Sequence, residues 1–280
     1  MNSSCKEVHR GMKKHIGGVF IALMYILLYA PLLVMVFFSF NASKSTSVFT
    51  GFSLRWYREL FSSSDTVAAL KNTLLLAILS AVIATLLGTA AAVGISKMRR
   101  GAARSVIMTV TNIPMMNPDI VTGVSLMLLF VFVGRIIGAA TSLSFWTLLI
   151  AHITFNLPYV ILNVLPKLRQ TDRHLSEAAM DLGSTPVRAF FNVVLPQAYT
   201  GILSGFLMAF TLSLDDFVIS YYTNGANFQT LPLKIFAMTK KTVKPDMYAL
   251  SSVIFIVVLI LLIASNLIGS SQERRRTSSR

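Results

Sequence analysis

Two adjacent carboxylates, Asp215 and Asp216, lie within an apolar run that reads FTLSLDDFVIS at residues 210–220. A third acid, Asp119, follows directly on Pro118 in the segment NIPMMNPDIV at residues 112–121. An ionised side chain placed in hydrocarbon costs about 2.5–3.5 kcal/mol on insertion scales, so such acids usually contact water or another charge. The chemistry that these residues suggest is attraction of a cation within or beside a membrane.

The acids belong to a chain with the composition of an integral membrane protein. Its 280 residues are 54% hydrophobic and 13% charged, with a mean hydropathy of +0.68, whereas soluble domains carry about 25% charged residues. A helix needs about 20 apolar residues to cross the hydrocarbon core. Six runs of this kind are Ile16–Phe40, Ala68–Ser96, Ser105–Val133, Leu143–Leu165, Val194–Tyr222 and Met247–Gly269. The sequence therefore predicts an all-α membrane protein with six transmembrane helices, of which the third and fifth are the least regular.

The formal net charge of +14 is distributed unevenly between the loops. Sixteen Lys and Arg lie in the two tails and in the loops after the second and fourth runs, eight lie in the other loops, and Lys71 lies at a span end. The positive-inside rule then predicts that both termini are cytoplasmic, so the basic excess reflects topology and not nucleic-acid binding. We expect tails at 1–15 and 271–280 around a permease domain at 16–270.

The third span is interrupted by Pro114 and Pro118, which each remove a backbone donor and disfavour helix before them. Broken helix in a membrane is tolerated where protein or a water-filled cavity surrounds it. We therefore expect Asp119 to line a cavity, with a proline kink beside a solvated acid as the alternative. The segment LPLKIFAM at 231–238 predicts either a short amphipathic helix at the membrane surface or an ordinary loop.

The fourth span contains polar residues within the segment AHITFNLPYV, at 151–160. These are His152 and Asn156, with Pro158 two residues later. Polar side chains inside a span commonly join helices through hydrogen bonds, and the sequence predicts that role here.

The longest inner loop, residues 171–197, predicts two short helices that meet at a sharp turn. The first, Asp172–Leu182, can be capped by Thr171 and end at Gly183, because a left-handed backbone conformation is easiest for glycine. The second can begin with Ser184 or Thr185 as its cap and with Pro186 in its first turn. Small side chains at Ala178 and Ala179 would let another protein approach the first helix closely.

The same loop resembles the EAA loop of binding-protein-dependent ABC importer permeases. The residues that carry the resemblance are Glu177, Ala178, Ala179, Gly183, Val193, Leu195 and Pro196. Val193 stands where that family prefers isoleucine. The resemblance implies a type I ABC importer permease fold, with a cytoplasmic coupling helix that docks in a cleft of an ATPase subunit.

Further segments run in the same order as in PotC-type permeases of bacterial spermidine/putrescine importers, which this chain resembles over residues 16–270. They are SFNAS, WYREL, MMNPDIV, AHITFNLPYV, EAAMDLG, FTLSLDDFVIS and LPLKI. The resemblance implies a PotB-type second permease, a PotA-type ATPase homodimer and a PotD-type extracytoplasmic polyamine-binding protein. It also implies a location among the lipids of the bacterial cytoplasmic membrane, with ATP and Mg bound by the ATPase and no cofactor in this chain.

The residues themselves argue against an enzyme. No G-x-x-x-x-G-K-[ST] loop, HExxH, Cys/His cluster or G-x-S-x-G occurs, so no nucleotide, metal or nucleophile site is predicted. An ABC permease subunit is the preferred class. A proton-coupled secondary transporter would be favoured by inverted repeats, which are not seen, and a membrane-embedded hydrolase would need a nucleophile and base.

The acids also indicate the sign of the substrate. Within the spans the charged residues are acidic, whereas Lys71 and Arg135 lie at span ends, which favours a cation such as a polyamine. Ferric ion, thiamine and aminophosphonate importers remain alternatives. On a continuous helix neighbours point about 100° apart, so only one of Asp215 and Asp216 should line the path while the other pairs with a polar group or sister permease. A rise of about 1.5 Å per residue puts Asp119 and Asp215 in the outer half. The alternative is that all three acids are hydrated helix-end acids.

Overall fold

The computed structural model describes residues 3–43, 48–99, 101–138, 143–170, 173–226, 228–240, 247–260 and 263. Within these residues the chain is helical and forms no strand. It divides into two compact units, one of residues 1–63 with 238–256 and one of residues 64–237 with 257–280. The described part contains five helices long and apolar enough to cross a membrane, and a shorter apolar helix at Met247–Ile260.

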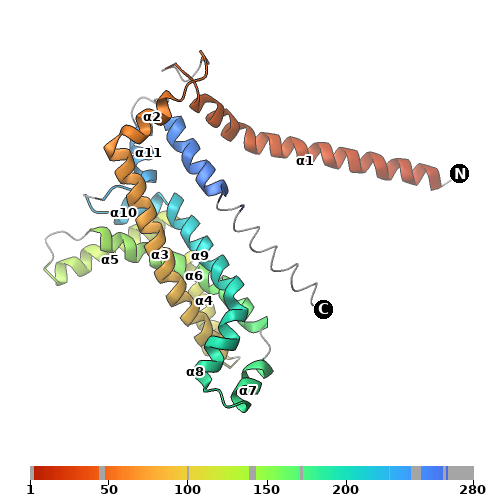
Figure 1. Ribbon diagram of the computed structural model, residues 1–280, viewed down its shortest axis with the longest axis vertical. Helices are drawn as coiled ribbons and strands as arrows, with labels where there is room; N and C mark the ends of the chain where they lie inside the picture. The colour runs from red at the N-terminus through yellow and green to blue at the C-terminus, as the bar shows by residue number, and fades with distance from the viewer. Residues whose placement is uncertain are drawn as a thin grey trace. The chain divides into compact units, whose positions relative to one another are not determined.

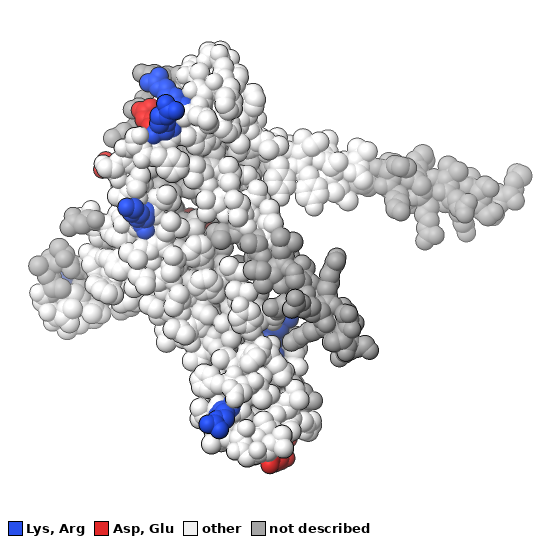
Figure 2. Space-filling view, in the orientation of Figure 1, with Lys and Arg blue, Asp and Glu red and all other residues white. Residues whose placement is uncertain are grey.

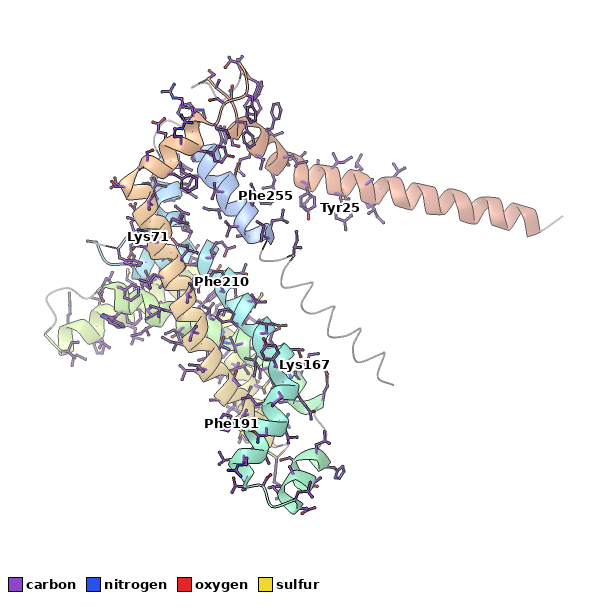
Figure 3. All side chains as sticks on the ribbon, in the orientation of Figure 1. Tyr25, Lys71, Lys167, Phe191, Phe210 and Phe255 are labelled. Carbon is purple, nitrogen blue, oxygen red and sulfur yellow. The ribbon has the colours of Figure 1, made fainter. Side chains whose placement is uncertain are left out.

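The first unit contains α1 (Ser3–Ser39) and α2 (Arg55–Ser62). Within Gly18–Ser39, the apolar part of α1, an 18-residue stretch has no residue buried against the rest of the chain. Tyr25 projects from this helix with 60% of its surface exposed (Figure 3). A helix this apolar needs lipid or another chain around it. Of the predicted sixth span, Met247–Ile260 is helical, whereas most of the stretch to Gly269 and the tail at 271–280 lie outside the described residues.

A buried asparagine organises the loop between α1 and α2. The Asn41 Nδ2 atom donates to the Val48 carbonyl at 2.7 Å, and its Oδ1 accepts from the Thr50 backbone N–H at 3.0 Å. The Asn41 backbone carbonyl accepts a hydrogen bond from Trp56 Nε1 at 2.7 Å. The segments SFNAS and WYREL therefore meet in space, and here they hold the loop together.

Three long helices form the core of the second unit (Figure 1). They are α3 (Ser64–Lys97), α6 (Phe145–Gln170) and α9 (Leu195–Asp215). Ala81 and Ala84 of α3 are fully buried with Val160 of α6. Small residues let helix backbones approach closely, which drives association where lipid is as apolar as the side chains. On the face drawn in Figure 2, the surface over α3 and α9 carries few charged side chains.

Helix α9 lies close to α6 at Gly201. A Cβ added there would lie 2.8 Å from both the Asn163 carbonyl oxygen and Lys167 Cγ; the latter side chain is labelled in Figure 3. We expect Gly201→Leu to destabilise the purified protein by about 1–3 kcal/mol, because the two backbones must separate. Thermal unfolding in detergent measures this. Gly94→Leu is the matched control, since a Cβ at Gly94 meets no atom within 4 Å. Equal effects of the two substitutions would contradict this account of the packing.

The third predicted span is broken, as expected, into α4 (Ala102–Met116) and α5 (Asp119–Ile136). The break falls at Asn117 and Pro118, which are both extended. Pro114 lies inside α4, in its last turn, and does not itself break the helix, contrary to the prediction. The height of Asp119 estimated from a continuous helix therefore does not apply.

The fifth predicted span also departs from a single helix. It begins earlier, because α8 (Pro186–Ala189) continues through a π-helical turn, η1 (Phe190–Val194), into α9. Pro196 has no N–H and its ring crowds the carbonyl four residues before it, which a locally wider turn relieves. The predicted end at Tyr222 is wrong: α9 stops at Asp215, and a separate helix, α10, spans Val218–Thr223.

The segment LPLKIFAM is helical, within α11 (Leu231–Thr239). Its first residue donates its backbone N–H to Thr73 Oγ1 at 2.7 Å, and Lys234 Nζ donates to Thr66 Oγ1 at 2.7 Å. These bonds fix α11 against the first turns of α3. The segment is therefore a helix and not a loop, and its place at the membrane surface stays a prediction.

Candidate functional site

The paired acids mark a break between two helices. Asp215 is the last residue of α9, and Asp216 has an extended backbone with φ −62° and ψ 125°. The Asp216 carboxylate accepts from the backbone N–H groups of Ile219 at 3.2 Å and Ser220 at 2.8 Å, which have no partner within the first turn of α10. The expectation that the two acids are successive residues of one helix is wrong, because Asp216 leaves α9 to cap α10.

A buried histidine completes the surroundings of Asp216. His152 of α6 has 1% of its side chain exposed, and its Nε2 atom lies 3.0 Å from Ser220 Oγ and 3.5 Å from Asp216 Oδ2. Only 6% of the Asp216 side chain is exposed, whereas Asp215 is exposed. The geometry thus assigns the two acids different surroundings: Asp216 has buried polar partners, and Asp215 is an exposed residue.

A second set of hydrogen bonds links the three core helices. Asn156 Nδ2 of α6 donates to Ser213 Oγ of α9 at 2.7 Å, and Ser213 Oγ lies 2.8 Å from Ser80 Oγ of α3. The helix-joining role predicted for His152 and Asn156 is therefore confirmed. Pro158 is buried inside α6 but has no N–H to donate.

Sequence reasoning missed the serine partners of these residues. They are Ser80, Ser213 and Ser220. Their one local signal is that Ser213 and Ser220 flank the paired acids within an otherwise apolar segment. Ser80 had no such signal, because its partner lies 133 residues away.

Asp119 is the first residue of α5 and is exposed. A carboxylate is favourable at this position, because the N-terminus of a helix carries partial positive charge. Helix α5 packs on α10, where a Cβ at Gly123 would lie 3.1 Å from the Tyr222 ring. Asp119 thus begins a helix that contacts the helix capped by Asp216. Among the described residues, no hydrogen bond or ion pair joins Asp119 to Asp215 or Asp216.

The inner loop forms the predicted pair of helices, α7 (Arg173–Asp181) and α8. Gly183 has φ +88°. Around it, the Ser184 N–H donates to the Ala179 carbonyl at 3.0 Å and the Gly183 N–H to the Met180 carbonyl at 2.9 Å. These two hydrogen bonds are the pair that defines a Schellman turn, so the predicted end of the first helix is confirmed. The Thr171 cap and Asp172 lie outside the described residues.

The second helix of the pair is capped by Thr185, whose Oγ1 accepts from the Arg188 backbone N–H at 3.3 Å. Pro186 is its first residue, as expected. Leu195 and Pro196 lie beyond the pair, at the start of α9, where the π-helical turn ends. The candidate coupling residues therefore lie in two places. One is residues 177–183, the end of α7 with the turn that follows it (the α7 turn), and the other is the first turn of α9.

The α7–α8 surface combines small, apolar and charged side chains. Glu177 and Ala178 are exposed and Ala179 is half-buried, and Glu177 Oε2 lies 3.3 Å from His174 Nδ1. Leu182 is 89% exposed and Val187 66%. These exposed apolar side chains are available for contact with another protein.

The described residues offer no group of three or more His, Cys, Asp or Glu that could hold a metal ion. The candidate sites themselves offer charge and contact surface. Accessible carboxylates lie at two helix ends, and an exposed apolar turn lies on the inner loop.

Comparison with known proteins agrees with this arrangement. The family model described as "Binding-protein-dependent transport system inner membrane component" matches residues 84–277. The putrescine transport system permease protein PotI of Escherichia coli strain K12 is 40% identical over 236 residues, which cover 84% of each chain. The spermidine/putrescine transport system permease protein PotC of Haemophilus influenzae is 37% identical over 240 residues, covering 85% of this chain and 90% of that one.

A solved structure shares the fold. A chain of a bacterial ABC transporter involved in import of the acidic polysaccharide alginate superposes with a TM-score of 0.72 at 15% identity, covering 95% of this chain and 98% of that one. The chain therefore belongs to the family of binding-protein-dependent transport system inner membrane components, as a multi-pass permease subunit of an ABC transporter and not an enzyme.

Proposed function

We propose that this chain forms half of the translocation path of an ATP-driven importer of polyamines. The observation that carries the proposal is the exposed carboxylate of Asp215 at the end of α9, beside a buried cluster that satisfies Asp216. A polyammonium ion is the complementary ligand. The relatives named for putrescine and spermidine/putrescine transport support the same substrate class.

In this proposal the three acids have two different roles. Asp119 and Asp215 present negative charge to a cation that leaves an extracytoplasmic binding protein, and Asp216 fixes the break that exposes Asp215. The attraction must stay modest, because a conducted cation must be able to leave each site.

The α7 turn is proposed as the surface that receives the motion of an ATPase. Glu177, Ala178, Ala179 and Gly183 would form the contact, and Leu195 and Pro196 would connect it to α9. ATP and Mg would be bound by that ATPase, a PotA-type homodimer, and no cofactor by this chain. A PotB-type permease would complete the path, and a PotD-type protein would deliver the substrate.

This arrangement requires both termini and the inner loop to face the cytoplasm. Single cysteines replacing Ser3, Ser184 or Ser278, in a Cys5→Ser background, should resist a membrane-impermeant thiol reagent in intact cells and react after permeabilisation. A cysteine at Ser62, in the predicted outer loop, should react in intact cells and serves as the control. Labelling of any of the three inner positions in sealed cells would show that the predicted orientation is wrong.

The substrate is tested by uptake in cells that lack their own polyamine importers. Cells that express this chain together with a second permease, the ATPase and the binding protein should take up labelled putrescine or spermidine, and unlabelled polyamines should compete. Ferric citrate, thiamine and an aminophosphonate are the matched competitors, because related importers carry them. Competition by one of these compounds, with none by polyamines, would show that the substrate is not a polyamine. The assignment as a permease would still stand.

A further inference from the structure

Aromatic side chains gather directly after the paired acids, on α10 and α11. Phe217 is the residue before α10, and the centre of its ring lies 4.4 Å from that of Phe236 of α11. The centre of the Tyr221 ring lies 5.6 Å from that of Phe217 and 5.9 Å from that of Phe236. The Tyr221 backbone N–H donates to the Phe217 carbonyl at 2.9 Å, so these two residues share one face of the turn. Phe217, Tyr221 and Phe236 together are named the aromatic cluster.

Tyr221 is the exposed member of the aromatic cluster, although the helix that carries it is held in place. It has 49% of its surface exposed, whereas Phe217 and Phe236 are half-buried. The Asp216 carboxylate caps α10 through two backbone N–H groups. Contact with two neighbouring rings restricts the rotamers of the Tyr221 side chain before any ligand binds. Tyr221 therefore offers a preorganised aromatic surface.

The faces of these rings are suited to a cation. An aromatic ring carries partial negative charge on its face, which attracts an ammonium group within about 6 Å of the ring centre. In the described part of the chain, the basic side chains that lie over rings are Arg55 on Trp56 and Lys97 on Phe190. No described Lys or Arg therefore lies over the Tyr221 ring.

An exposed acid stands next to the aromatic cluster. Asp215 is exposed and precedes Phe217 by two residues. Consecutive Cα atoms are about 3.8 Å apart, so the Cα atoms of Asp215 and Phe217 are at most about 7.6 Å apart. The carboxylate attracts one ammonium group, and the rings attract a second or cover the methylene groups that follow the first. An alkylammonium ion gains from both contacts, whereas a strongly hydrated metal ion gains mainly from the carboxylate.

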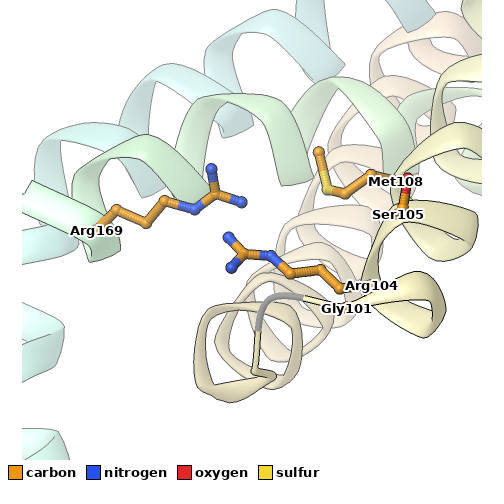
Figure 4. Close-up of a pocket in the computed structure, with 5 residues that line it drawn as sticks. All are labelled: Gly101, Arg104, Ser105, Met108 and Arg169. Carbon is orange, nitrogen blue, oxygen red and sulfur yellow. The ribbon is translucent and has the colours of Figure 1, made fainter.

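The pocket drawn in Figure 4, between α4 and α6, does not offer these contacts. It is lined by Gly101, Arg104, Ser105, Met108 and Arg169. None of these residues is acidic or aromatic, so a cation meets neither a carboxylate nor a ring face in its wall. The aromatic cluster beside Asp215 is better suited to an organic cation.

We propose that Tyr221, supported by Phe217 and Phe236, is a cation–π subsite that holds an ammonium group of the substrate next to Asp215. The subsite adds a preference for organic ammonium ions to the attraction that the acids provide. It rests on the proposed function, because it requires an organic cation to pass Asp215 on its way across the membrane. Tyr221 is then a specificity-determining residue whose ring, and not its hydroxyl group, makes the contact.

The test is uptake of labelled putrescine into proteoliposomes that contain the whole complex, measured below saturation and normalised to the amount of complex. Tyr221→Phe keeps the ring and should retain uptake. Tyr221→Leu keeps an apolar side chain without a ring and should lower uptake by about two- to fivefold, as expected for an exposed cation–π contact. Tyr25→Leu is the matched control, because Tyr25 is also exposed, at 60%, but lies on α1. It should leave uptake unchanged.

A second series separates attraction for a cation from packing. Tyr221 is replaced by phenylalanine that carries one, two or three fluorine atoms on its ring. These side chains have nearly the same size, but their ring faces become progressively less negative, which weakens the attraction for a cation. Uptake should fall stepwise along the series while the thermal stability of the complex stays the same.

Two results would overturn the proposal. One is uptake by Tyr221→Leu equal to that of the unaltered complex. The other is equal uptake across the fluorinated series together with a loss in Tyr221→Leu, which would give Tyr221 a packing role only. Absence of putrescine uptake by the unaltered complex would instead overturn the proposed function, and this inference with it.

Discussion

Polyamine uptake is expected to fall by about tenfold below saturation when Asp215 is replaced by asparagine, equivalent to about 1.4 kcal/mol of lost attraction for the cation. Asparagine keeps the size of the side chain and one acceptor oxygen, and it removes the charge. The accessible Asp215 carboxylate at the end of α9 makes it the acid most directly available to a substrate. Initial uptake rates, normalised to the amount of complex in the membrane, measure the effect.

The neighbouring acids provide the comparison. Asp119→Asn should also lower uptake, with assembly intact, because that side chain is exposed at the start of α5. Asp216→Asn retains one oxygen for the N–H groups of Ile219 and Ser220, and its loss of uptake should come with lower thermal stability. Asp65→Asn, an exposed acid in the first turn of α3, is the control. Wild-type uptake in all three test variants would show that the acids are not part of the translocation path.

The second large effect is expected at Gly183. Its φ of +88° is strained for any residue with a Cβ, at a cost of about 1–3 kcal/mol. Gly183→Val should therefore distort the turn between α7 and α8, leaving the chain inserted but without a fitted contact for an ATPase. Co-purification of the ATPase and transport-linked ATP hydrolysis are the two readouts.

The matched control is Gly138→Val, because Gly138 also has a positive φ, of +68°, but follows α5. It strains a turn outside the α7–α8 surface and should leave ATPase association unchanged. Glu177→Lys tests the charge on that surface and should have a smaller effect, since an exposed ion pair contributes only about 0–1 kcal/mol. Normal assembly and coupling in both Gly183→Val and Glu177→Lys would show that the loop does not couple the subunits.

Local backbone chemistry explains which features could be predicted from the sequence. The turn at Gly183 and the cap at Thr185 depend on residues within a few positions of each other, and both were predicted correctly. The break at Pro118 follows in the same way from a missing backbone donor. The apolar runs predicted that the chain contains helices able to cross a membrane, because length and composition decide this. They did not predict that the fifth helix ends at Asp215.

The surroundings of the paired acids could not be predicted, because they depend on tertiary contacts. FTLSLDDFVIS reads as one continuous apolar helix, and an aspartate that caps a short helix differs little in sequence from one that lies on a helix. What separates Asp216 from Asp215 is His152, 64 positions earlier in the numbering. That histidine comes near only after α6 and α9 have packed together.

The most direct test of the central claim is transport by the reconstituted complex. Proteoliposomes that contain this chain, the second permease and the ATPase should accumulate labelled polyamine only when ATP and the loaded binding protein are both supplied, each on its own side of the membrane. A pH gradient without ATP should drive none. Uptake driven by the gradient alone, or independent of the binding protein, would contradict the assignment of this chain to an ATP-driven polyamine importer.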